Sequence, residues 1–136
     1  MLYKRYRLSN DLSKLRQQLR RTFGAMSQAL ASLLRSAPMV QGSFYLLRRK
    51  CGKPNCRCAS GQLHASWVLS RSEQGKDRLY SVPKEQRGRL RAWASEYRRY
   101  QRARALLVKR HAQIVALADQ IAQKRLLVWP EKEPPP

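Results

Sequence analysis

Apolar residues recur every three or four positions between residues 10 and 36, with arginines and other polar residues between them. This spacing predicts an amphipathic helix. Ser9 or Asn10 would cap its start, and Ala37-Pro38 would end it because the residue before a proline avoids the helical conformation. The apolar positions are Leu12, Leu15, Leu19, Phe23, Met26, Leu30 and Leu33.

Residues 40–82 follow a different pattern, in which short apolar and aromatic runs alternate with turn-forming residues. We expect strands at 43–49, 66–72 and 77–82, joined at one end by the hairpin turn Glu73-Gln74-Gly75-Lys76. A second turn is expected at 51–58, where glycine, proline and asparagine favour tight backbone. A segment this short buries little apolar area by itself and needs a further source of stability.

Val82-Pro83 opens a longer helix, because proline suits the first helical turn. We expect this helix to end near residue 128, with His111 packed in its interface, and we expect the tail 129–136 to be disordered. Its apolar stripe needs a partner, either the N-terminal helix in an antiparallel pair or a second copy of the chain in a coiled coil. The stripe consists of Leu90, Trp93, Tyr97, Tyr100, Leu107, Ile114, Ala118 and Ile121, widened by Ala94, Val108, Val115 and Ala122.

The patterns together predict an α+β protein with four segments. The first is an amphipathic helix at 10–36, and the second is a three-stranded antiparallel β module at 40–82. The third is a long basic helix at 83–128 that forms an antiparallel helical pair or a coiled coil, and the fourth is the tail.

All three cysteines of the chain lie within the run Cys51-Gly52-Lys53-Pro54-Asn55-Cys56-Arg57-Cys58, and His64 follows closely. Three thiolates and one imidazole make a full tetrahedral set for Zn²⁺, with no position left open for chemistry. The spacing predicts a structural zinc site formed by Cys51, Cys56, Cys58 and His64. Structural zinc contributes roughly 10–16 kcal/mol of apparent binding free energy in small fingers, which would supply the stability that the β module lacks. A redox-active or reactive thiol is the alternative, with Lys53 and Arg57 providing a positive field.

The net charge is +21, from 29 lysines and arginines against 8 aspartates and glutamates, and the charge is spread along the whole chain. This is the electrostatic signature of a polyanion binder. No apolar stretch is long enough to cross a membrane, and the first residues have no apolar signal-peptide region. An odd number of clustered cysteines without a signal peptide fits a reducing cytoplasm and a metal, not a disulfide framework.

Two groups of basic residues are candidates for contacts with nucleic acid, because neither is balanced by acidic residues. The first group surrounds the cysteines and the second lies in the first half of the long helix. A solvated helix face is the alternative for the second group. The candidates are Arg48, Arg49, Lys50, Lys53 and Arg57, with Arg87, Arg91, Arg98 and Arg102.

Aromatic side chains could also stack on unpaired bases. The candidates are Tyr3, Tyr6, Tyr45, Trp67 and Tyr80. The last three fall on expected strands, where a role in the core competes. Catalysis is not expected, because no two-metal carboxylate cluster, phosphate loop, nucleophile elbow or His-Glu metal motif is present.

The segment from about 40 to 110 resembles an uncharacterised family of short, basic bacterial proteins, catalogued as a domain of unknown function. The resemblance is carried by Gly42-Ser43-Phe44-Tyr45-Leu46, the Cys-Gly-Lys-Pro-x-Cys-x-Cys run, His64 and Val82-Pro83-Lys84-Glu85-Gln86. It implies a metal and a setting beside transposases and other mobile-element genes. In that family the histidine is followed by Gly-Pro and an aromatic run, whereas here Ala65-Ser66-Trp67 follows it.

We therefore expect a non-catalytic, zinc-dependent nucleic-acid-binding protein of the cytoplasm or nucleoid, with DNA favoured over RNA. It would be accessory to a mobile element or a recombination system. The alternative is a coiled-coil adaptor that docks on a transposase or recombinase through its helix stripe. An RNA-binding factor is a third hypothesis. No membrane association is expected.

Overall fold

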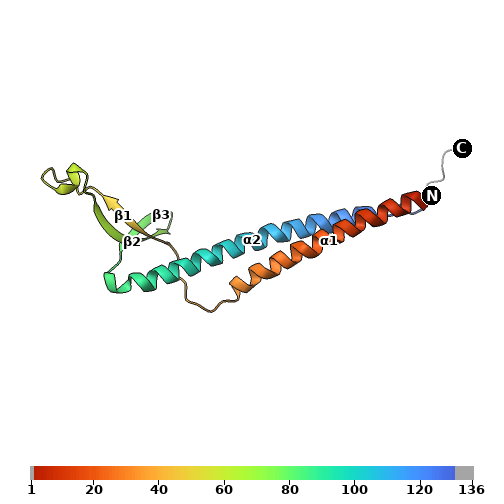
Figure 1. The fold of residues 1–136 in the computed structure, drawn as a ribbon, viewed down its shortest axis with the longest axis horizontal. Coiled ribbons are helices and arrows are strands. Elements are labelled where there is room, and N and C mark those ends of the chain that lie inside the picture. Colours follow the sequence, from red (N-terminus) through yellow and green to blue (C-terminus); the bar gives the residue numbers. More distant parts are fainter. Residues whose placement is uncertain (1, 131–136) are drawn as a thin grey trace. The chain divides into compact units, whose positions relative to one another are not determined.

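The computed structural model describes the backbone of residues 2–130 and the side chains of residues 11–130. In chain order the elements are α1 (Leu2–Leu33), β1 (Ser43–Arg49), the 3₁₀ turn η1 (Arg57–Ser60), β2 (His64–Glu73), β3 (Lys76–Ser81), the 3₁₀ turn η2 (Lys84–Gln86) and α2 (Arg87–Arg125) (Figure 1). The predicted α+β class is confirmed. The chain divides into two compact units, one made of α1 and the part of α2 from Arg102 onward, the other of residues 35–101.

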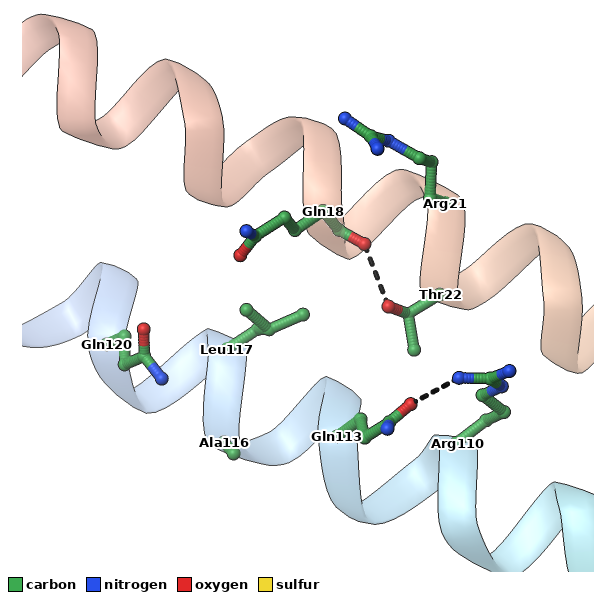
Figure 2. A pocket seen from close by; sticks show the side chains of 8 residues that line it. All are labelled: Gln18, Arg21, Thr22, Arg110, Gln113, Ala116, Leu117 and Gln120. Atoms are coloured by element: carbon green, nitrogen blue, oxygen red, sulfur yellow. Dashed lines mark hydrogen bonds between the residues drawn. The ribbon is translucent and has the colours of Figure 1, made fainter.

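The helical unit pairs α1 with the second part of α2, and the two segments run antiparallel. Lys124 near the end of α2 lies 3.8 Å from Asp11 in α1, whereas Arg110 and Gln113 line one groove together with Thr22. Figure 2 shows this groove and the two hydrogen bonds inside it, from Thr22 to the Gln18 carbonyl at 2.8 Å and from Arg110 to Gln113 at 2.8 Å. Polar side chains therefore occupy part of the space between the helices.

The helix limits differ from those expected. α1 already includes Ser9 and Asn10, which were expected to cap it, because the residues before them contain no proline or glycine to stop a helix. α1 ends at Leu33. The 3₁₀ turn η2 directly precedes α2, which ends at Arg125. The predicted tail lies mostly at residues 131–136, outside the described part of the chain.

In the second part of α2 the apolar stripe agrees with the predicted one at Leu107, Ile114 and Ile121, which are half-buried, but it differs at its edge. Ala103 is buried, whereas Val108 is 58 % exposed and Val115 is also exposed. His111, expected to pack in the interface, is exposed as well. The helical period of 3.6 residues drifts away from a strict heptad, and Leu106 and Leu117 are half-buried in place of the two valines that were expected to widen the stripe.

The sheet of the second unit is antiparallel with the order β1-β2-β3. β2 and β3 form the predicted hairpin, with Glu73 opposite Lys76. Gln74 and Gly75 both adopt positive φ, as a two-residue hairpin turn requires. β2 is longer than expected because it begins at His64 and not at Ser66.

One face of the sheet packs against the start of α2. The buried cluster consists of Leu69 from β2, Val82 just after β3, and Ala94 from α2. Four half-buried side chains pack around it: Val40, Phe44, Trp67 and Leu90. The Val40 N–H donates to the Trp93 carbonyl and the Val82 N–H donates to the Trp67 carbonyl. This core fixes the base of the β1–β2 hairpin, whose far end carries the cysteines.

Candidate metal centre

The cysteines lie in the loop of the β1–β2 hairpin, and the strand pairing brings the two ends of this loop together. Arg49, the last residue of β1, is directly opposite His64, the first residue of β2. Cys51 therefore follows the last ladder pair on one side, while His64 belongs to that pair on the other. In Figure 1 this loop extends from the ends of β1 and β2.

The backbone between these ends turns the two remaining cysteines inward. The Cys56 N–H donates to the Lys53 carbonyl at 3.3 Å, which closes a tight turn through Pro54 and Asn55. The 3₁₀ turn η1 follows and buries Cys58, which is 1 % exposed. Gly61 ends this turn at φ +113°, a conformation that favours glycine.

The four donor atoms converge on one point. Cys51 Sγ lies 3.4 Å from Cys58 Sγ, and Cys56 Sγ lies 3.1 Å from His64 Nε2. All four donors lie within 4.8 Å of one another. A tetrahedral ion held by sulfur and nitrogen at about 2.0–2.3 Å needs donors roughly 3.3–3.8 Å apart. The four predicted residues therefore lie close enough to hold a metal ion.

Hydrogen bonds and burial shift the pKa values of two of the thiols in opposite directions. A backbone hydrogen bond from Lys53 lowers the pKa of Cys51, and the hydrogen bond with the Cys58 thiol lowers it further. The Cys51 amide, which lies 3.3 Å from Cys58 Sγ, favours the thiolate of Cys58. Burial and the neighbouring thiols outweigh this amide, so the pKa of Cys58 is raised. A bound metal cation would favour the thiolate, which is the form that binds metal.

Five of the predicted basic residues surround this loop and are exposed: Arg48, Arg49, Lys50, Lys53 and Arg57. None of them forms an ion pair within the part of the chain whose side chains are described. The sequence explains why, because no aspartate or glutamate occurs between Leu12 and Ser72. The loop is thus a concentrated, uncompensated positive surface.

The four predicted arginines of α2 are not brought together in the same way. The Arg91 guanidinium lies 4.9 Å from the centre of the Trp67 ring and 5.5 Å from that of Phe44, so it covers the core. Arg87 is half-buried, and Arg98 is exposed. Arg102 belongs to the helical unit.

Two contacts around this unit escaped prediction because they join positions far apart in sequence. Arg35 donates to both carboxylate oxygens of Glu96, at 2.7 and 3.1 Å. Phe44 and Trp67 stack at 4.9 Å between ring centres, which assigns Trp67 to the core and leaves Tyr45 and Tyr80 exposed. The side chains of Tyr3 and Tyr6 lie outside the described residues.

Comparison with known proteins gives one match. The model of a family described as a domain of unknown function (DUF6788) matches residues 6–92, a span that includes the whole metal loop. No curated protein and no solved structure matches the chain. Among the described helices, none combines the length and apolar character needed to cross a membrane.

Proposed function

The chain belongs to the DUF6788 family, whose function is unknown, and from the geometry of its metal centre we propose that it is a zinc-dependent nucleic-acid-binding protein. Zinc is the ion that best fits three thiolates and an imidazole in a closed tetrahedral set. With all four positions taken by the protein, the ion would have a structural role and no open position for catalysis.

One observation carries the proposal: the loop closed by the four residues that could hold a metal, together with the adjoining end of β1, displays five exposed, unpaired basic side chains. Three of the five are arginines, whose planar guanidinium matches the oxygens of a phosphate. A loop tied down by four ligands presents these charges at little cost in conformational entropy. Contacts of this kind bind the backbone and not the base edges, so they position a nucleic acid without reading its sequence.

We favour DNA over RNA, and a role accessory to a mobile element or recombination system. This part of the proposal depends on the resemblance of the cysteine motif to proteins found beside transposases. The metal and the charge serve either polymer equally well, so the experiment includes both.

The test is a binding titration of the zinc-loaded chain against duplex DNA, single-stranded DNA and structured RNA at several salt concentrations. The triple variant Arg48→Ala/Arg49→Ala/Lys53→Ala should reduce the slope of log K against log salt by about 2 to 3, because each lost phosphate contact removes 0.7–0.9 from it. The matched control is Arg16→Ala/Arg20→Ala/Arg21→Ala, which removes the same charge from exposed positions of α1. Equal slopes for both variants would contradict the proposed surface.

A helical adaptor is the second candidate, and exposed apolar side chains in the helical unit favour it. Phe23, Leu34 and Val108 are all more than half exposed. In this case the helices would dock on a transposase, a recombinase or a second copy of the chain. Loss of binding to all three polymers at about 150 mM salt, together with self-association of the free chain, would favour the adaptor.

A further inference from the structure

The two faces of the sheet differ in what covers them. Residues directly opposite each other in an antiparallel pair point to the same face, and neighbours along a strand alternate. The register Phe44–Leu69 and Leu46–Trp67 therefore defines the first face, which packs against the start of α2. Residues 35–101 contain no other α-helix that could cover the second face.

The second face follows from the same register. β1 contributes Tyr45, Leu47 and Arg49, β2 contributes Val68, and β3 contributes Leu79. Tyr45 is 37 % exposed and Leu79 is 48 % exposed, whereas Val68 on the central strand is 4 % exposed. The remaining positions of this face are mostly serines, among them Ser66, Ser70 and Ser81.

We propose that this second face binds single-stranded nucleic acid, with one unpaired base stacked on the Tyr45 ring and the adjoining phosphate held by Arg49. The inference rests on the proposed function and names its substrate class. Aromatic rings stack on any base, which gives affinity without a sequence preference. In a duplex the base faces are already stacked on one another and are inaccessible to Tyr45.

Charge complementarity selects this occupant over a protein. Arg49 stands four residues from Tyr45 along the same face, with Leu47 between them, and Lys50 follows Arg49 in the chain. The one carboxylate of the face, Asp77, pairs with Ser72 at the end of the sheet away from Arg49. The apolar part is small and interrupted by hydroxyl groups, which suits a base with its sugar better than the continuous apolar patch of a protein interface.

The other aromatic side chains of the unit are already engaged. Trp67 stacks on Phe44 and is covered by Arg91. The Tyr80 hydroxyl donates a hydrogen bond to the Glu73 carboxylate, and the Arg71 guanidinium lies 5.0 Å from the centre of the Tyr80 ring. Tyr45 is therefore the aromatic ring of this sheet that is free to receive a base, among the described side chains.

The experiment measures binding of the full-length, zinc-loaded chain to an oligothymidylate and to an abasic strand of equal length at one salt concentration. The two strands carry the same phosphates and differ in their bases. Wild type should prefer oligothymidylate by roughly 5- to 150-fold, the range for one stacked base. Tyr45→Ala should lose this preference while its affinity for the abasic strand is unchanged, and Tyr45→Phe should keep it.

A second measurement needs no variant and covers the case in which Tyr45→Ala does not fold. A strand containing 5-iodouracil is cross-linked to the wild-type chain by light, and the attachment point is mapped by mass spectrometry. Attachment at Tyr45 supports the inference. Attachment elsewhere, or equal binding of both strands by wild type, overturns base stacking while nucleic-acid binding stands. Failure to bind either strand would instead contradict the proposed function itself.

Discussion

At the scale of single residues, His64 is the one nitrogen donor in a centre otherwise made of sulfur, and it decides whether the donor set is complete. Its Nε2 lies 3.1 Å from Cys56 Sγ. His64→Cys keeps four donors, whereas His64→Ala leaves three. We expect His64→Cys to retain one zinc ion per chain in native mass spectrometry and His64→Ala to lose it during dialysis. Retention of zinc by His64→Ala with unchanged affinity would show that the histidine is not a ligand.

Glu96 and Arg35 give a stability that depends on pH. Hydrogen bonds from Arg35, with its charge and that of Arg99, hold the pKa of Glu96 below the ordinary value of 4.5. A carboxylate with a lowered folded-state pKa stabilises the fold above its unfolded pKa and loses that contribution as the pH falls through the folded value.

Glu96→Gln should therefore melt at a slightly lower temperature than wild type at pH 7, and the gap should close as the pH falls below 4.5. The effect is small because the Arg35 side chain is 46 % exposed, so solvent screens the ion pair. Glu85→Gln removes an exposed carboxylate without an ion pair among the described side chains, and its melting temperature should stay close to that of wild type throughout. A gap for Glu96→Gln that does not narrow at all as the pH falls below 4.5 would contradict the assignment.

At this scale the four residues that lie close enough to hold a metal could be predicted, because they fall in one short run with distinctive chemistry. The ion pair between Arg35 and Glu96 could not, because these residues are separated by 61 positions and meet only in the folded unit. The contacts of Arg91 could not be predicted either. The sequence suggests a phosphate ligand, whereas the fold places its guanidinium over two rings that come from separate strands.

At the scale of elements, Gly42 controls how the chain enters β1. Its φ is +140°, and a Cβ there would stand 2.7 Å from the Ser70 carbonyl oxygen. Gly42→Ala should therefore destabilise the sheet, by roughly 1–3 kcal/mol for a strained backbone position. Gly88→Ala is the matched control, because no atom lies within 4 Å of its added methyl group.

Gly88 lies in α2, where alanine is favoured over glycine by about 0.5–1 kcal/mol. The midpoint of urea unfolding should therefore be lower than that of wild type for Gly42→Ala and higher for Gly88→Ala. Equal midpoints for both variants would mean that β1 can shift away from β2 at no cost.

The element types could be predicted because apolar residues recur with a period of about 3.6 residues in helices and 2 residues in strands. The width of a long stripe could not, as α2 demonstrates. Val108 and Val115 were predicted to widen the stripe, but both are exposed, whereas the stripe positions Leu107 and Ile114 are half-buried. The turn Glu73-Gln74-Gly75-Lys76 was predicted correctly because its two central residues tolerate positive φ.

At the scale of the whole molecule, charge is the dominant feature. Among the described side chains, ion pairs engage Arg35, Arg71, Arg78, Arg99 and Lys124, a small part of the 29 basic residues. A net charge of +21 destabilises a compact state through self-repulsion. A bound polyanion relieves this repulsion, and so does salt, which screens it over a Debye length of about 30 Å at 0.01 M and 10 Å at 0.1 M.

Salt should consequently act with opposite signs on the free chain and on its complex. The melting temperature of the free, zinc-loaded chain should rise between about 10 and 150 mM sodium chloride, because shorter screening weakens repulsion among the basic residues. A saturating oligonucleotide should raise the melting temperature further, and this additional increase should become smaller over the same salt range. The reason is that counterion release contributes less free energy to binding as the salt concentration increases. Differential scanning fluorimetry of both samples measures the two trends together. If salt instead lowered the melting temperature of the free chain, attractive ion pairs would outweigh repulsion, and relief of repulsion could not contribute to binding.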